Sequence, residues 1–273
     1  MEKIVISQSF MKAMNKGWEP HETDGHGTKC PAKAKAIHLD GMATEATAAM
    51  MKGNYFETLV FGGTEDGSKP VMEMSKTGKK TVEQTRVEAH ASKFMGRVRL
   101  ERKMDFSEPR RKVEVRIHKT RLVFFRARID MVSSFMDESG EVHQKAIIDT
   151  KLTDSVFSNY PKEFAWGTPG EMDHTQAIAY TWAYEKETGK RVPFWYYVMD
   201  VSPQENAMWI GGTPTEEMIS VFKEDLSRTT RLILEYLSRN IWPEIPSADN
   251  CRNCPIRHSC KSYPMGSNIK RIW

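Results

Sequence analysis

Two aspartates and a lysine close two apolar, strand-like segments in the middle of the chain. Asp130 ends the first segment, and Asp149 and Lys151 end the second. On a strand, residues two apart point to the same face, so Asp149 and Lys151 project together, and Asp130 on a neighbouring strand can add a second carboxylate. Two carboxylates and the backbone carbonyl of Thr150 make an oxygen site suited to Mg²⁺ or Mn²⁺. Such an ion would lower the pKa of a bound water and neutralise a phosphate, while Lys151 positions the water.

An aspartate and a lysine separated by one residue are a weak signal alone, because most such triplets are surface charge. Two features strengthen it. The apolar run 146–148 precedes the triplet, so the strand is expected to be buried, and the next helix carries Gln176 and Tyr180 one turn apart on one face. A polar pair on an otherwise apolar helix favours contact with a functional site, although an ordinary amphipathic helix edge explains it equally well.

The four cysteines could converge on one metal centre. Cys251, Cys254 and Cys260 lie close together near the C-terminus, whereas Cys30 lies near the N-terminus. Soft metals and iron–sulfur clusters need four thiolates around one point, so we expect the two ends of the chain to be joined there. The polar neighbours of the C-terminal cysteines argue against four reduced core thiols. Spacing alone allows both zinc and an iron–sulfur cluster.

Composition and charge limit the class of protein. With 39% hydrophobic residues and no apolar run approaching the roughly 20 residues that span a bilayer, we expect no membrane segment. The N-terminal residues lack the apolar core of a signal peptide, which predicts a cytoplasmic location where disulfides are rare. A dense basic stretch runs from Arg97 to Arg128. A solvated surface explains such a stretch, and phosphate contact is the alternative.

The hydrophobic pattern predicts an α/β fold with a mixed central β-sheet flanked by helices. We predict one domain over residues 1–273: a helical part at 1–60 that carries Cys30, a core at 81–211, and a helix with the cysteine tail at 212–273. Trp166, in a loop at 160–172, could wedge into a nucleic acid. The expected helices are a short one within 4–16 and others at 44–60, 81–104, 173–186 and 214–240; the expected strands are 112–119, 121–132, 142–152, 192–201 and 207–211; the expected loops are 17–29 and 63–80.

Taken in order, these residues resemble the PD-(D/E)xK nuclease superfamily, specifically its RecB-like branch with an iron–sulfur cluster. That branch includes the AddB nuclease domain and the cluster-bearing exonucleases of CRISPR adaptation. Asp130 and the triplet 149–151 look like the metal motifs, and the segment 176–180 looks like the Q-x-x-x-Y motif. Glu57 ends a segment similar to the helix motif that contributes a His or Glu to the metal site. Many relatives carry His at that position.

The cysteines extend the resemblance to both ends of the chain. Residues 7–9 followed by Cys30 and Pro31 look like the N-terminal Ser…Cys-Pro element, and the C-terminal three look like the terminal cluster triad. The resemblance implies a restriction-endonuclease-like core and a structural [4Fe–4S] cluster, with zinc as the alternative. The implied cluster ligands are Cys30, Cys251, Cys254 and Cys260.

The resemblance also implies an activity: a metal-dependent deoxyribonuclease, an exonuclease on single-stranded DNA or duplex ends, with endonuclease action open. The implied setting is recombination, repair, phage replication or CRISPR adaptation, with DNA and proteins of those processes as partners. Two alternatives remain: a non-catalytic DNA-binding subunit with the same fold, and a zinc-stapled interaction protein. The implied metal ligands are Glu57, Asp130, Asp149 and the Thr150 carbonyl; Lys151 would position the water, and Gln176 and Tyr180 would orient the lysine or contact the DNA backbone.

Overall fold

The computed structural model describes residues 3–14, 29–44, 46–62, 78–153, 155–157, 166, 168–202, 206–245, 248–251 and 253–262. The chain divides into two compact units. The first unit comprises Met1–Glu45, Glu114–Arg126 and Glu216–Trp273, and the second comprises Ala46–Val113 and Ala127–Thr215. That residues 1–273 form one nuclease domain stays a prediction. No helix in the described ranges has the length and apolar character needed to cross a membrane.

The second unit is built on a mixed sheet, as the sequence predicted. Strand β3 (Val123–Met136), which begins in the first unit, pairs antiparallel with β4 (Val142–Thr153). Strand β4 runs parallel to β5 (Phe194–Asp200), which pairs antiparallel with β6 (Ala207–Gly212). Strand β2 (Glu108–Arg116) also pairs with β3. A parallel pair needs a long crossover connection, and helix α6 lies within the one between β4 and β5.

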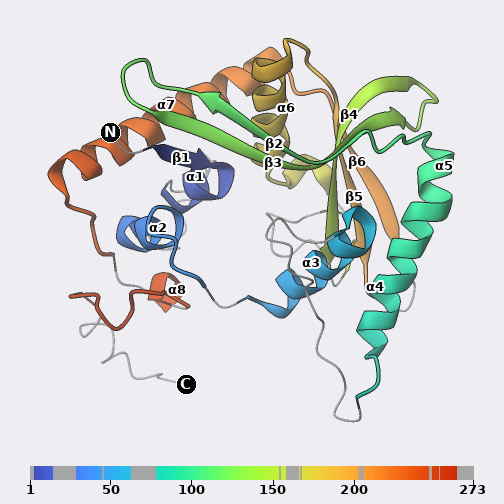
Figure 1. The fold of residues 1–273 in the computed structure, drawn as a ribbon, viewed down its shortest axis with the longest axis horizontal. Helices are drawn as coiled ribbons and strands as arrows, with labels where there is room; N and C mark the ends of the chain where they lie inside the picture. Colours follow the sequence, from blue (N-terminus) through green and yellow to red (C-terminus); the bar gives the residue numbers. More distant parts are fainter. Residues whose placement is uncertain are drawn as a thin grey trace. The chain divides into compact units, whose positions relative to one another are not determined.

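Helices lie on both sides of this sheet. Figure 1 shows α4 (Val82–Lys93) and α6 (Thr175–Thr188) on opposite sides of the strands β4–β6. Ile148 of β4 belongs to the core cluster formed with α3 (Ala48–Phe61) and α4, whereas its neighbour Asp149 contacts α6. This follows from the alternation of side chains along a strand.

The helices of the second unit begin and end at residues with suitable chemistry. The hydroxyl oxygens of Thr47 and Thr81 accept hydrogen bonds from backbone N–H groups of the first turns of α3 and α4, at 3.2 and 3.1 Å. Helix α4 continues through one π-helical turn (Phe94–Val98) into the short α5 (Arg99–Glu101). Gly189 ends α6 with φ of 73°, the left-handed conformation that glycine adopts without strain.

The first unit holds the two ends of the chain. Strand β1 (Ile4–Ser7) pairs in parallel with the first residues of β3, and α1 (Gln8–Met14) follows it. The amphipathic α7 (Glu216–Arg239) contributes Phe222, whose ring packs edge-on against Phe125 of β3 at 5.6 Å between centroids. The remaining helices are α2 (Pro31–His38) and α8 (Ala248–Cys251).

Three local features differ from the sequence prediction. The short helix expected within 4–16 is preceded by β1, whose four residues are too few to show a period. Helix α2 was not predicted, because its alternating alanine and lysine residues carry no apolar stripe. The helix expected over 81–104 contains the π-helical turn and ends at Glu101. The loops predicted at 17–29 and 63–80 lie almost wholly outside the described residues.

Candidate active site

The two predicted metal-binding aspartates lie side by side on neighbouring strands of the second unit. In the antiparallel register of β3 and β4, Met131 pairs with Ile148, so one further step places Asp130 opposite Asp149. Opposed residues on antiparallel strands share a face of the sheet. The backbone N–H and the hydroxyl of Thr150 donate hydrogen bonds to Oδ2 of Asp130 at 2.9 and 3.2 Å. Asp130 is therefore fixed against β4.

Asp149 is held at both carboxylate oxygens. Its side chain is 1% exposed. Oδ1 accepts a hydrogen bond from Nε2 of Gln176 at 2.8 Å, and Oδ2 forms an ion pair with the ammonium of Lys151. Oδ2 is buried and has no partner with hydrogen-bond geometry among the described residues. This oxygen is therefore a buried acceptor that lies against the positive charge of Lys151.

Glu57 and Tyr180 approach the same carboxylates from two helices. Glu57 follows Phe56 on α3, and the Phe56 ring is 1% exposed and packs edge-on against Phe94 at 6.1 Å. The carboxylates of Asp130 and Asp149 lie close enough to raise the pKa of Glu57. Tyr180 lies one turn after Gln176 on α6, with its ring edge-on to Phe194 at 6.4 Å. Burial, then the charge of Asp149, raises the pKa of Tyr180 to about 12.

The carboxylates of this cluster are buried close to one another, and this raises their pKa values. Burial raises the pKa of Glu57 to about 8 and that of Asp149 to about 7, and repulsion from Asp130 adds to both. Burial also raises the pKa of Asp130. Burial acts to lower the pKa of Lys151, but the charges of Asp149 and Asp130 raise it overall. Such perturbed carboxylates mark a place where additional positive charge would be stabilising.

The model of the PD-(D/E)XK nuclease superfamily matches residues 27–261. The chain belongs to this superfamily. The nuclease also resembles a solved structure at the level of the fold. A candidate exonuclease from Eubacterium rectale is 14% identical with a TM-score of 0.62, over 98% of this chain and 90% of that one. An alkaline exonuclease from Laribacter hongkongensis is 15% identical with a TM-score of 0.35, over 71% of this chain and 95% of that one. No curated protein sequence matches the chain.

The residues of this nuclease fit the divalent ion that its superfamily uses. Carboxylates of Glu57, Asp130 and Asp149 come from a helix and two strands, and they supply the hard oxygen atoms that Mg²⁺ and Mn²⁺ prefer. The hydrogen-bond-free Oδ2 of Asp149 is a suitable ligand atom. The predicted residues Glu57, Asp130, Asp149, Thr150, Lys151, Gln176 and Tyr180 all belong to the second unit.

A second acidic group lies in the hairpin between β3 and β4 and was not singled out from the sequence. Ligand atoms of Asp137, Glu141 and His143 lie within 4.8 Å of one another. Oδ1 of Asp137 already accepts bonds from the backbone and hydroxyl of Ser139 and from the backbone of Glu141. The Ser139 hydroxyl above all lowers the pKa of Asp137, to about 2. These bonds close the turn, so the group has a structural explanation.

The cysteines of the nuclease are all free thiols in the first unit. Cys30 is buried at the start of α2, and its Sγ accepts a hydrogen bond from the backbone of Ile245 at 3.4 Å. The N–H of Ala32 donates to the carbonyl of Pro243 at 3.1 Å. The start of α2 therefore contacts the segment that leads to α8 and Cys251. Within the described residues, no three thiols lie within 4.8 Å of one another.

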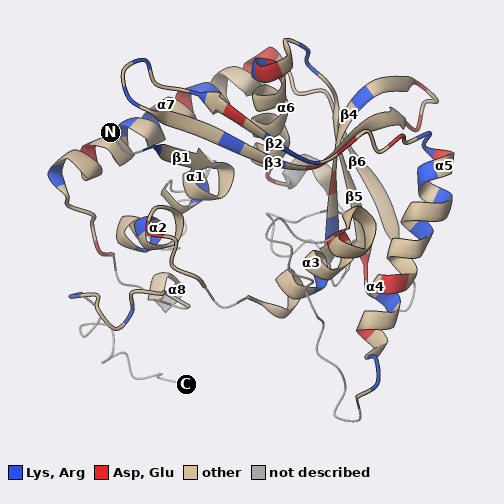
Figure 2. Cartoon of the chain, in the orientation of Figure 1, with Lys and Arg blue, Asp and Glu red and all other residues tan. Residues whose placement is uncertain are grey.

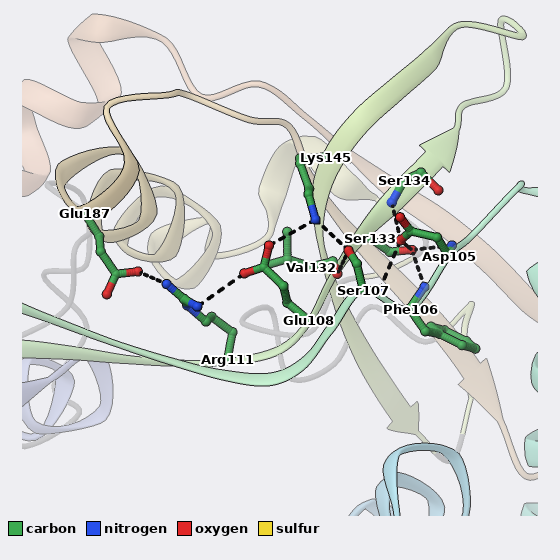
Figure 3. Close-up of polar contacts among 10 residues, drawn as sticks. All are labelled: Asp105, Phe106, Ser107, Glu108, Arg111, Val132, Ser133, Ser134, Lys145 and Glu187. Atoms are coloured by element: carbon green, nitrogen blue, oxygen red, sulfur yellow. Dashed lines mark hydrogen bonds and ion pairs between the residues drawn. The ribbon is translucent and has the colours of Figure 1, made fainter.

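Several residues of the basic stretch form ion pairs within the protein. Figure 2 shows basic and acidic residues interleaved along α4 and α5. Arg111 contacts both Glu187 and Glu108, as Figure 3 shows, and Arg126 pairs with Glu114. These pairs favour the structural interpretation of the stretch.

Trp166 does not fit the role of a DNA wedge. The side chain is only 3% exposed, and its ring packs against Tyr196 at 5.4 Å. Burial against the strand removes the exposed aromatic face that base stacking needs.

Proposed function

We propose that this nuclease is a divalent-metal-dependent exodeoxyribonuclease acting on single-stranded DNA or duplex ends. The observation that carries the proposal is the cluster of Asp130 and Asp149 on the neighbouring strands β3 and β4, where Thr150 donates hydrogen bonds to Asp130, and Lys151 and Gln176 contact Asp149. The exonuclease assignment is supported by the name of the Eubacterium rectale neighbour, which shares the fold.

The proposed ligands are Glu57, Asp130, Asp149 and the carbonyl of Thr150. A bound Mg²⁺ or Mn²⁺ would lower the pKa of a water and neutralise charge on the phosphate. Lys151, whose ammonium lies against Asp149, would donate a hydrogen bond to that water or to a phosphate oxygen. The water oxygen forms the new bond to phosphorus and releases its proton to solvent. The ester oxygen on the far side leaves and takes up a proton.

Gln176 and Tyr180 act on this chemistry through position. Gln176 fixes one oxygen of Asp149, so the other oxygen faces Lys151. Like any tyrosine, Tyr180 is protonated at neutral pH, and burial raises its pKa further, to about 12, so its hydroxyl can donate to a phosphate oxygen.

Degradation of end-labelled DNA with Mg²⁺ or Mn²⁺, and with a chelator as control, tests the proposal. Lys151→Ala should slow cleavage by about 100-fold or more, the usual effect of removing one preorganised donor. Lys190→Ala, at an exposed lysine after α6, is the matched control. Equal cleavage by Lys151→Ala and wild type would remove the assignment. DNA binding without cleavage in any metal would favour the non-catalytic subunit.

We also propose that Cys30, Cys251, Cys254 and Cys260 bind a [4Fe–4S] cluster, with zinc as the alternative. The contact of Cys30 with the segment before α8 supports a shared site. A tetrahedral zinc with bonds of about 2.3 Å needs sulfurs about 3.8 Å apart, whereas a cluster spans a wider gap. No three of the described thiols lie within 4.8 Å of one another. Anaerobic purification with iron, sulfide and zinc analysis separates the two; zinc without iron would exclude the cluster.

A further inference from the structure

Arg110 on β2 is a positive charge beside the proposed metal site that sequence analysis did not single out. Its Nη2 donates a hydrogen bond to the backbone carbonyl of Glu57 at 3.4 Å. Its charge acts to lower the pKa of both Glu57 and Asp130. Arg110, Glu57 and Asp130 all belong to the second unit. The guanidinium is therefore within electrostatic reach of two of the three proposed ligands.

Despite this proximity, the Arg110 guanidinium makes few contacts with the described residues. Among the described residues it forms no ion pair within 4.0 Å, and its buried Nε has no hydrogen-bond acceptor. A guanidinium carries five N–H donors, and the described residues provide an acceptor for one of them, the carbonyl of Glu57. The neighbouring Arg111 differs, because it contacts Glu187 and Glu108 (Figure 3). Within the described part of the chain, Arg110 therefore has N–H donors left to bind a ligand.

The backbone of Arg110 is strained as well. Its φ is +52°, in the left-handed region that is unfavourable for a non-glycine residue. Such strain, together with an unsatisfied buried donor, is a poor solution if the residue serves stability alone. Strained residues of this kind are concentrated at functional sites.

The charges of the proposed site also leave a role for Arg110. The three carboxylates of Glu57, Asp130 and Asp149 are balanced by a divalent ion together with the ammonium of Lys151. Arg110 then adds one positive charge, which matches the single negative charge of a phosphodiester. Arginine presents its donors in a planar fork that fits two phosphate oxygens.

We propose that Arg110 binds a DNA phosphate at the active site, an inference that rests on the proposed nuclease function. The contact would hold the phosphate beside the carboxylates and stabilise the charge that develops on it during hydrolysis. The competing explanation is structural: Arg110 would only tether α3, and with it Glu57, to β2.

Binding and cleavage measurements on the full chain separate the two explanations. Affinity for a labelled single-stranded oligonucleotide is measured over a series of KCl concentrations, with Ca²⁺ present to slow cleavage. Arg110→Gln should weaken binding about tenfold and reduce the slope of log K against log salt by about 0.7, the loss of one phosphate contact. Arg239→Gln, at an exposed ion pair on α7, is the control and should keep the wild-type slope.

Arg110→Lys is the second variant. It keeps the charge but loses the fork, so its salt slope should stay near the wild-type value while kcat/KM falls about tenfold. If Arg110→Gln does not fold, the kcat/KM of Arg110→Lys tests the proposal. An unchanged slope for Arg110→Gln, with a lowered Tm, would overturn the proposal in favour of the tether, as would wild-type kcat/KM for Arg110→Lys. If the wild-type chain binds DNA but does not cleave it with any metal, the proposed function is refuted. The phosphate contact of Arg110 can still be measured in that case, from the slope of log K against log salt.

Discussion

Gln176 donates a hydrogen bond from its side-chain amide to Oδ1 of Asp149 at 2.8 Å. This one contact joins α6 to β4 at the proposed catalytic carboxylate. Because Asp149 is buried, the amide decides which oxygen is left toward Lys151. Helix α6 therefore contributes to the proposed site as well as packing against the sheet.

Gln176→Ala should therefore reduce activity more than stability. Without the amide, Asp149 can rotate away from the geometry that a metal needs, and kcat should fall about 10- to 100-fold, as for other residues that orient a ligand. Initial rates measured against Mn²⁺ concentration should also show a weaker apparent metal affinity. Gln144→Ala, at an exposed glutamine on β4, is the control. A Gln176→Ala variant with wild-type metal dependence would contradict the role of the amide.

The acids of the site predict opposite pH trends for the metal-free and metal-bound protein. Their folded pKa values are raised, to about 8 for Glu57 and about 7 for Asp149, so the folded state binds more protons than the unfolded chain. This contribution to stability is complete below about pH 4, the unfolded pKa, and is lost as pH rises toward about 8. With Mn²⁺ present, the ligands must be deprotonated, so the stabilisation by metal should grow with pH.

Thermal unfolding from acidic to alkaline pH, in chelator and in Mn²⁺, measures both trends. The two Tm curves should diverge as pH rises. Glu57→Gln removes one of the acids with a raised pKa and should bring the Tm curves in chelator and in Mn²⁺ closer together at high pH. Parallel curves over the whole range would show that these carboxylates do not bind the ion.

The sequence predicted the aspartates of the site better than it predicted the surroundings. Asp130 and Asp149 lie in strands long enough to show their apolar character, so their common face was predicted from alternation, although β3 continues past Asp130 to Met136 and β4 continues past Asp149 to Thr153. Gln176 followed from helical spacing. Arg110 could not be found this way, because neither a φ of +52° nor a contact with Glu57, 53 residues away, leaves a local pattern. Strand β1 was not predicted for a similar reason, because it is formed by pairing with β3, which is distant in the sequence.

Ser133→Ala should destabilise the second unit. Ser133 is fully buried on β3, and its hydroxyl oxygen accepts hydrogen bonds from the backbone N–H groups of Asp105 and Phe106, both at 3.0 Å (Figure 3). Removing it leaves two part-buried donors without an acceptor, which costs about 1–3 kcal/mol for each group that water cannot reach. Urea unfolding should show a loss of about 2–3 kcal/mol.

Ser134→Ala is the matched control for this change. Its hydroxyl donates to the carbonyl of Lys103 at 2.6 Å, in a more exposed position where water can replace it. The loss should be under about 1 kcal/mol. Equal losses at Ser133 and Ser134 would mean that the buried pair of backbone donors finds other partners.

Phe56 links the core of the second unit to the proposed metal site, because the next residue on α3 is Glu57. The Phe56 ring is 1% exposed and packs against Phe94. Phe56→Leu keeps the site apolar but loses part of this packing, so we expect a loss of about 1–2 kcal/mol in stability. Since α3 can then shift on β4, the apparent affinity for Mn²⁺ should fall as well. Leu59→Ala changes an exposed residue of the same helix and should leave metal affinity unchanged. If Phe56→Leu lowers Tm but leaves Mn²⁺ affinity at the wild-type value, Glu57 is not a ligand held in place by this packing.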